Sequence, residues 1–244
     1  MGAVADPARG ILVAHQPAYL PWCGYFSRLL DVPQMIILDH VQFSERGYQH
    51  RNRILDRTGT LRWLTVPVRR RFGQPLCDVR IADPEWARRH WRTLTATYGK
   101  APFWPVYADH LGAVFAQQWT TLVDLDLALT RLLLDAFGMS VTLVRSSTVH
   151  PAGTKTAMLI DLCSRTGDRV LRVGTGALKY LDRAALHDAG IRVEVATYTH
   201  PPYPQNHPGT FIPAVSVIDL LVQQGPAARD ILARGCAITP WPTT

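Results

Sequence analysis

The sequence predicts an α/β fold in which helices flank a mostly parallel sheet, with a largely helical middle segment. Short apolar runs alternate with segments of helical periodicity along the 244 residues, and this alternation is typical of parallel strands joined by helical crossovers. The chain has no internal repeat and no long linker, so we expect a single domain over residues 11–235. Residues 1–10 and 236–244 are expected to form short tails.

The expected strands are short apolar runs. Ile11–Ala14 and Met35–Leu38 are continuously apolar and are expected to be buried, whereas Leu61–Val68 alternates apolar and polar residues and is expected to be half-buried. The expected strands of the second half are 141–144, 170–173 and 191–197.

The expected helices begin and end at residues that suit helix termini. Asp83 and Pro84 start one helix, as its N-cap and first residue. The longest helical pattern covers 106–137, is interrupted near 119–121 and stops at Gly138. The remaining helical patterns cover 25–30, 155–165, 178–189, 215–224 and 226–234.

Composition argues against several classes of protein. No apolar run reaches the roughly 18 residues that a membrane-spanning helix needs, and the first ten residues lack the apolar core of a signal peptide. The four cysteines are widely spaced, without a CxxC pair, which argues against structural zinc and against a disulfide framework. We therefore expect a cytoplasmic protein with reduced thiols, and we interpret Cys23 as a buried apolar residue in preference to a nucleophile.

The net charge of +7 permits anionic partners. The excess arginines cluster in 46–57, 69–71 and 88–92, and such clusters usually form a solvated face. No continuous basic stripe or known nucleic-acid module is visible, so the sequence does not favour nucleic acid as a partner. We instead expect a small-molecule substrate, which could be carrier-bound or phosphorylated; whether the chain forms a homodimer stays open.

Polar or glycine-rich segments start where three of the expected strands end. His15, Asp39 and Gly174 each directly follow an apolar run. In an open parallel sheet these strand ends share one edge, and ligands bind at that edge. A polar pocket there is the main functional prediction.

The loop after the first strand offers the most chemistry. It contains His15, Gln16, Tyr19, Trp22 and Gly24, which combine an acid–base group, an amide, a hydroxyl and a flat ring, as recognition of a small polar molecule requires. The alternative is an aromatic loop packed against the core, with His15 as a hydrogen-bonded structural histidine. The position at a strand end favours the functional interpretation.

Two further segments of the first third could contribute to the pocket. Asp39 could orient a histidine, act as a base or bind an amine, or it could cap a turn; Gln42 follows it in the same segment. Arg51 offers a planar fork for a carboxylate or phosphate, and Asn52 can pair with an amide or hydroxyl. The alternative for these last two residues is a solvated basic loop.

Two segments of the second half are weaker candidates. The glycine-rich turn at 174–176 could present backbone N–H groups to an anion, although it is not a complete nucleotide-binding motif. Lys179 behind it could contact an anion, act as a nucleophile or simply lie at the surface, which is the commoner place for a lysine. The proline-rich loop at 200–207, with Tyr203 and Gln205, is interpreted as either a lid or a wall of the pocket.

Together these segments resemble the WbqC-like family of bacterial biosynthetic proteins. The resemblance covers nearly the whole chain, from Ile11 to Gly235. It rests on His15-Gln16-Pro17, Tyr19-Leu20-Pro21-Trp22, Gly24-Tyr25-Phe26, Leu38-Asp39, Val41-Gln42-Phe43, Arg51-Asn52, Trp63-Leu64-Thr65-Val66-Pro67, Tyr180-Leu181, Pro202-Tyr203, Gln205, Phe211 and Ser216-Val217-Ile218-Asp219-Leu220-Leu221. The family usually has two adjacent acidic residues where this chain has Asp39 and His40, so a role that needs a carboxylate pair is not expected.

The resemblance implies a tailoring enzyme of surface-sugar or specialised-metabolite biosynthesis. The order of strand, histidine-bearing loop, helix and strand is also similar to the Rossmann-like HUP folds that bind nucleotides. The second histidine of those folds is absent here, so ATP binding remains an analogy. No Ser-His-Asp set and no metal-ligand set is evident, and we expect no cofactor, no metal and no covalent nucleophile.

The leading hypothesis is an enzyme that transfers an acyl or aminoacyl group to an amine-bearing small molecule. In this hypothesis His15 is the general base and Asp39 orients or charges the site. The residues expected to bind substrate are Gln16, Tyr19, Trp22, Gln42, Arg51, Asn52, Lys179, Tyr180, Tyr203 and Gln205. The alternatives are a cyclase or dehydratase that needs no cosubstrate, a non-catalytic ligand- or carrier-binding protein, and RNA or carrier-protein binding through the arginines.

Overall fold

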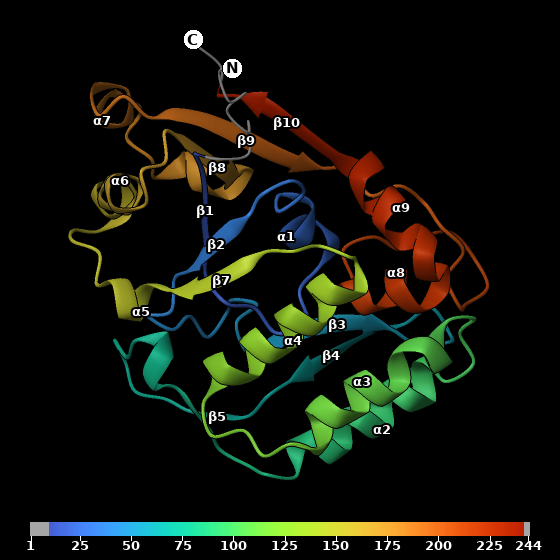
Figure 1. Ribbon diagram of the computed structural model, residues 1–244. Coiled ribbons are helices and arrows are strands. Elements are labelled where there is room, and N and C mark those ends of the chain that lie inside the picture. Colours follow the sequence, from blue (N-terminus) through green and yellow to red (C-terminus); the bar gives the residue numbers. More distant parts are fainter. Residues whose placement is uncertain (1–9, 242–244) are drawn as a thin grey trace.

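A mostly parallel sheet forms the centre of the protein and confirms the predicted α/β class (Figure 1). The computed structural model describes residues 10–241, and within them this sheet has the strand order β10-β9-β8-β1-β2-β7. Neighbouring strands pair in parallel except β10, which pairs antiparallel with β9. The strands are β1 (Ile11–His15), β2 (Gln34–Ile37), β7 (Thr142–Arg145), β8 (Val170–Gly174), β9 (Arg192–Tyr198) and β10 (Cys236–Pro240).

The path of the chain reverses direction at the middle of this sheet. From β1 the chain moves outward through β2 to β7, then returns to β8 on the other side of β1 and moves outward again through β9. Val13 of β1 therefore has Met35 on one side and Arg172 on the other. Open parallel sheets bind their ligands at such a reversal, beyond the carboxyl ends of the strands.

Helices cover both faces of the sheet because successive residues of a strand point to opposite sides. Leu12 and Ile36 pack on one layer of helices, whereas Val13 and Met35 pack on the other. Figure 1 shows the two layers on either side of the sheet. The first layer consists of α6 (Lys155–Thr166) and α7 (Arg183–Asp188). The second layer includes α1 (Cys23–Ser27), α4 (Leu122–Ala136), α8 (Val217–Gln224) and α9 (Ala228–Gly235).

The helical middle segment is confirmed, with the expected interruption. The long pattern divides into α3 (Trp104–Ala116) and α4, and the side chain of Thr121 caps α4 by accepting a hydrogen bond from the Asp124 N–H. Gly138, at φ +61°, stops the pattern in a conformation that few other residues adopt. The preceding helix is α2 (Trp86–Tyr98), and none of the described helices is long and apolar enough to cross a membrane.

The remaining elements are short. Two small antiparallel sheets pair β3 with β4 and β5 with β6. Their bounds are β3 (Arg51–Leu55), β4 (Leu61–Thr65), β5 (Val68–Arg69) and β6 (Arg80–Ile81). The other short elements are α5 (Ser146–Val149) and the 3₁₀ turns η1 (Leu76–Asp78), η2 (Thr175–Lys179) and η3 (Gly225–Ala227).

Two segments expected to be irregular are strands instead. The predicted C-terminal tail is wrong for residues 236–240, which form β10. The alternative of a basic loop for Arg51 and Asn52 also does not hold, because both residues lie in β3. Most of β10 is exposed and several residues of β3 are polar, so neither segment has the apolar pattern that identifies a strand. Of the predicted N-terminal tail, residues 1–9 lie outside the described residues.

Candidate functional site

A cavity of about 580 Å³ opens beyond the carboxyl ends of β1, β8 and β9. It lies where the chain path reverses between β1 and β8, the position that the sequence predicts for a ligand pocket. The lining residues that matter below are His15, Gln16, Trp22, Arg28, Tyr180 and Tyr198. Other surface hollows, such as one beside Trp91 and Trp119 and one lined by arginines of α2, lie away from these strand ends.

His15 is the last residue of β1 and is partly buried in the cavity wall. Its Nδ1 donates a hydrogen bond of 2.7 Å to the carbonyl oxygen of Gln16. Because a carbonyl oxygen only accepts, this bond holds the proton on Nδ1 and leaves the lone pair on Nε2, which bonds to no described residue. Burial and the positive charge of Arg28 lower the pKa of His15 to about 3, so the imidazole is neutral at pH 7.

Gln16 is held in place by a chain of amide hydrogen bonds. Its Oε1 accepts a bond of 2.7 Å from Nε2 of Gln49, and Oε1 of Gln49 accepts one of 2.7 Å from the backbone N–H of Ser44. The amide N–H groups of Gln16 are therefore available to a ligand in the cavity. The segment around residue 50 thus contributes to the site through the buried Gln49, which orients Gln16.

Trp22 and Tyr180 supply aromatic surface to the cavity. A Cβ atom at Gly24 would lie 2.1 Å from the ring of Trp22, so this ring packs directly on the backbone at the start of α1. The ring of Trp22 also contacts Tyr198 edge-on at 5.9 Å and lies 5.5 Å from His200. The loop after β9 therefore supports the wall of the cavity from behind.

The sequence interpretation missed two of these cavity residues, the aromatic Tyr198 and the charged Arg28. Its side chain lines the cavity although the residue is only 9% exposed. Its Nε donates a hydrogen bond of 3.1 Å to the carbonyl oxygen of Gly24, and its guanidinium lies against Gly174. The available signal was a single charged residue in the apolar stretch 23–30.

Asp39 is buried at the junction of β2, β7 and α5 and does not line this cavity. Its carboxylate accepts hydrogen bonds from Oγ of Ser146 at 3.0 Å, from the N–H and Oγ of Ser147 at 2.7 Å each, and from Nε of Arg145 at 2.6 Å. Burial alone would raise the pKa of Asp39, but the bonds from Ser147 and Arg145 outweigh it and lower the pKa. Asp39 thus caps the first turn of α5 and does not act in the pocket. Of the Leu38-Asp39 pair, Leu38 lines the cavity and Asp39 does not.

The side chains of Gln42, Arg51 and Asn52 also lie outside the cavity lining. The Arg51 guanidinium stacks over the ring of Trp63, 4.6 Å from its centroid. Asn52 is buried, and its Nδ2 donates a hydrogen bond of 2.6 Å to the Leu20 carbonyl oxygen. Gln42 is exposed. The predicted grouping of these residues with His15 does not form. Arg51 and Asn52 lie on a separate hairpin of β3 and β4 that does not join the main sheet, and Gln42 forms an isolated bridge with Pro75.

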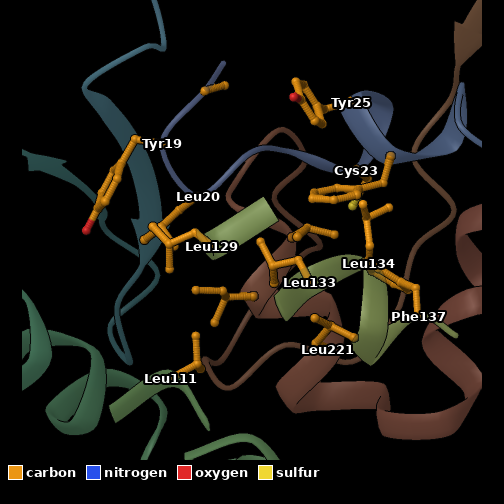
Figure 2. Packing of buried hydrophobic residues seen from close by; sticks show 14 of the residues in the cluster. Tyr19, Leu20, Cys23, Tyr25, Leu111, Leu129, Leu133, Leu134, Phe137 and Leu221 are labelled. Carbon is orange, nitrogen blue, oxygen red and sulfur yellow. The ribbon is translucent and has the colours of Figure 1, made fainter. Parts of the chain in front are cut away.

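Tyr19 and Cys23 belong to the hydrophobic core in Figure 2. Tyr19 is fully buried and its hydroxyl group bonds Nδ1 of His90 in α2 at 2.7 Å, so it does not form a wall of the cavity. Cys23 is 2% exposed, and burial raises the pKa of its thiol to about 12. This environment agrees with the interpretation of Cys23 as an apolar packing residue.

Tyr203 and Gln205 bind a carboxylate of the core and lie outside the cavity lining. The Tyr203 hydroxyl and the Gln205 amide donate hydrogen bonds of 2.8 and 3.0 Å to Asp219 of α8. These bonds fix the loop after β9 against α8. Lys179 is exposed at the end of η2 and likewise does not line the cavity.

The residues that the structure brings together define what the cavity can do. A neutral imidazole, an oriented amide, three aromatic side chains and one buried cation face a common volume. Such a set can bind a small polar molecule and accept a proton from it. Within residues 10–241, no group of three or more His, Cys, Asp or Glu side chains is placed to hold a metal ion.

Comparison with known proteins gives the family of the chain. The model of the WbqC-like protein family matches residues 16–231. An uncharacterised protein of Mycobacterium tuberculosis, Rv1507c, is 35% identical over 224 residues, which cover 89% of this chain and 95% of that protein. No solved structure is significantly similar. From the extent of both matches, the chain belongs to the WbqC-like protein family.

Proposed function

We propose that this chain is a biosynthetic enzyme that transfers an acyl or aminoacyl group to an amine-bearing small molecule in the cavity. The observation that carries the proposal is the position of His15, which lines the cavity, is anchored through Nδ1 on the Gln16 carbonyl, and is free at Nε2. Nε2 can accept the proton of an attacking amine, and because the lowered pKa makes His15 a weak base, the proposal requires substrate binding to raise that pKa. The strand-end position of the cavity supports the same interpretation.

The proposed step balances with an activated acyl donor, an ester or a thioester. The amine nitrogen attacks the carbonyl carbon of the donor and forms a C–N bond, while its proton moves to Nε2 of His15. The tetrahedral adduct then loses the alcohol or thiol, which takes the proton back from His15. The amide N–H groups of Gln16 can donate to the carbonyl oxygen while negative charge develops on it.

The other cavity residues have supporting roles in this proposal. Trp22 and Tyr180 provide flat apolar surface for the substrate. Gln49 keeps the Gln16 amide in one orientation through its 2.7 Å hydrogen bond. Asp39 does not touch the substrate in this proposal. It is a positioning residue, because its hydrogen bonds connect the end of β2 to β7 and α5.

The reaction and its base can be tested together in a host strain that lacks the gene. The strain is complemented with the wild-type chain, with His15→Gln or with His110→Gln, an exposed histidine of α3 that serves as the control. Metabolites are compared by untargeted mass spectrometry at equal protein levels. We expect the empty strain and the His15→Gln strain to accumulate the same amine. The wild-type and His110→Gln strains should convert this amine into a product heavier by one acyl group.

Each other outcome has a defined meaning. A product lighter than its precursor by one water would replace acyl transfer by cyclisation or dehydration. No metabolite difference between the empty and wild-type strains would favour a non-catalytic binding protein. Full conversion by the His15→Gln chain would remove His15 from the reaction.

A further inference from the structure

Two buried arginines lie near the middle of the main sheet, and only one of them is paired. Arg172 of β8 is 8% exposed and has a counter-charge, because its Nε donates a hydrogen bond to Glu194 at 2.8 Å. Its Nη1 also donates to the Arg28 and Leu30 carbonyl oxygens at 3.3 and 3.1 Å. Arg28 is 9% exposed and makes one hydrogen bond, from Nε to Gly24. Its two Nη atoms have no hydrogen bond or ion pair within the described residues, and neither belongs to the fully enclosed polar atoms that lack a partner, so they are open to the cavity.

Among residues 10–241, no acidic side chain forms an ion pair with Arg28. The ionisable groups that act most strongly on it are Tyr25, Cys236 and Tyr180. Burial raises the pKa of each of these groups, so all three are neutral at pH 7. A buried cation without a counter-charge is costly to the folded state. The cavity is the direction from which a counter-charge can come, because Arg28 lines it.

The guanidinium is packed against the glycine-rich turn that follows β8. A Cβ atom at Gly174 would lie 3.0 Å from Nη2 and 3.2 Å from Nη1 of Arg28. Gly174 has φ −86°, a conformation open to any residue. The absence of a side chain at 174 therefore serves the close approach of the guanidinium. By contrast, a Cβ atom at Gly176 would meet nothing within 4 Å.

We propose that Arg28, seated against Gly174, binds an oxyanion of the substrate, either a carboxylate or a phosphate. A guanidinium presents a planar fork of donors that matches two oxygen atoms of such a group. This inference rests on the proposed function for the identity of the molecule as a substrate, but the anion site itself stands on the geometry of Arg28. In this proposal Arg28 takes the anion-binding role that the sequence analysis gave to Arg51 and Lys179, because neither of those residues lines the cavity.

An anion at Arg28 would also act on His15. The charge of Arg28 is the second cause, after burial, that lowers the pKa of His15. Neutralising that charge makes Nε2 of His15 a stronger base. Binding of the anionic substrate would thus prepare the imidazole for the proton transfer that the proposed function assigns to it.

The anion site can be tested with inorganic phosphate and with acetate, each titrated at constant ionic strength against chloride. Thermal unfolding is followed for the wild-type chain, Arg28→Met, Gly174→Ala and the matched control Gly176→Ala. We expect at least one of the two anions to raise the melting temperature of the wild-type and Gly176→Ala chains. The apparent affinity should fall at least tenfold in Arg28→Met and in Gly174→Ala. The anion that gives the larger shift identifies the substrate group as phosphate or carboxylate.

A second readout separates a binding role from a structural one. Without added anion, Arg28→Met should melt at about the temperature of the wild-type chain or above it, because the guanidinium has no counter-charge and opens only to the cavity. A lower melting temperature together with an unchanged anion response would overturn the proposal. So would the absence of any response to both anions in the wild-type chain.

The His15→Gln chain distinguishes this inference from the proposed function. We expect the His15→Gln chain to keep the anion-induced rise in melting temperature and to lose turnover. If this variant keeps the rise and also keeps turnover, His15 is not the base, and the anion site is unaffected. If Arg28→Met keeps turnover and anion response while His15→Gln loses turnover, the anion site is wrong and the base stands.

Discussion

The adjacent residues His15 and Gln16 both contribute functional groups to the cavity, and each depends on a hydrogen bond that involves Gln16. The backbone of Gln16 sets the tautomer of His15, and its side chain, held by Gln49, turns amide donors toward the same cavity. Burial and, after it, the charge of Arg28 lower the pKa of His15 and keep the imidazole neutral. The chemistry of the cavity therefore depends on how these few groups constrain each other.

The low pKa of His15 makes the stability of the protein depend on pH. The pKa is about 3 in the folded chain and 6.5 in an unperturbed histidine. Above pH 6.5 the residue is neutral in both states. Below it, the unfolded chain binds a proton that the folded chain does not, so stability falls as the pH decreases toward 3. At pH 5 this loss amounts to about 2 kcal/mol.

Urea unfolding at pH 7 and pH 5 measures this effect. The His15→Gln chain should lose about 2 kcal/mol less than the wild-type chain between the two pH values. The exposed His110→Gln variant should behave like the wild type. An equal loss in the wild-type and His15→Gln chains would show that His15 is not held neutral by the fold.

Among the elements, the junction of β2, β7 and α5 depends on one carboxylate. Asp39 receives donors from the end of β7 and from the first residues of α5. Arg145 also pairs with the half-exposed Asp124 of α4 at 3.0 Å. The junction fixes Leu38, the residue before Asp39, in the cavity wall.

Substitution of Asp39 should destabilise the fold without removing a catalytic group. Asp39→Asn leaves the donors of Ser147 and Arg145 poorly matched and should cost about 3 kcal/mol. Asp124→Asn alters the other partner of the same arginine and should cost less than about 1 kcal/mol, because that pair is exposed. Chemical denaturation compares the two variants. Equal costs would contradict a special role of Asp39 at the junction.

At the scale of the whole molecule, β10 closes one edge of the main sheet. It pairs antiparallel with β9 from Cys236, opposite Tyr198, to Pro240, opposite Glu194. Tyr198 lies at the cavity end of β9 and supports Trp22. An edge strand such as β10 protects the backbone groups of its neighbour from pairing with other chains.

Removal of β10 should therefore weaken the fold and expose β9. A chain that ends at Gly235 should melt at a lower temperature and self-associate at high concentration. A chain that ends at Trp241, the last described residue, is the control. Light scattering and thermal unfolding measure both effects. Identical behaviour of the two chains would show that β10 does not stabilise the sheet.

The class of fold could be predicted because its signals are local. The apolar runs at Ile11–Ala14 and 170–173 and the interrupted pattern over 106–137 correspond to β1, β8 and the α3–α4 pair. The strand β10 could not be predicted in this way, because its burial pattern is mostly exposed and only its partner β9 makes it a strand. The same holds for β3, which pairs with β4.

By itself, the sequence determined the alternation of strands and helices, the edge of the sheet that bears the cavity, and His15, Gln16, Trp22 and Tyr180 as residues around it. Only the tertiary structure decided that Asp39 caps a junction and that Arg28 faces the cavity against Gly174. Periodicity and strand ends are properties of neighbouring residues. The partner of a charged side chain is set by packing between segments far apart in the chain, so a local sequence pattern cannot predict it.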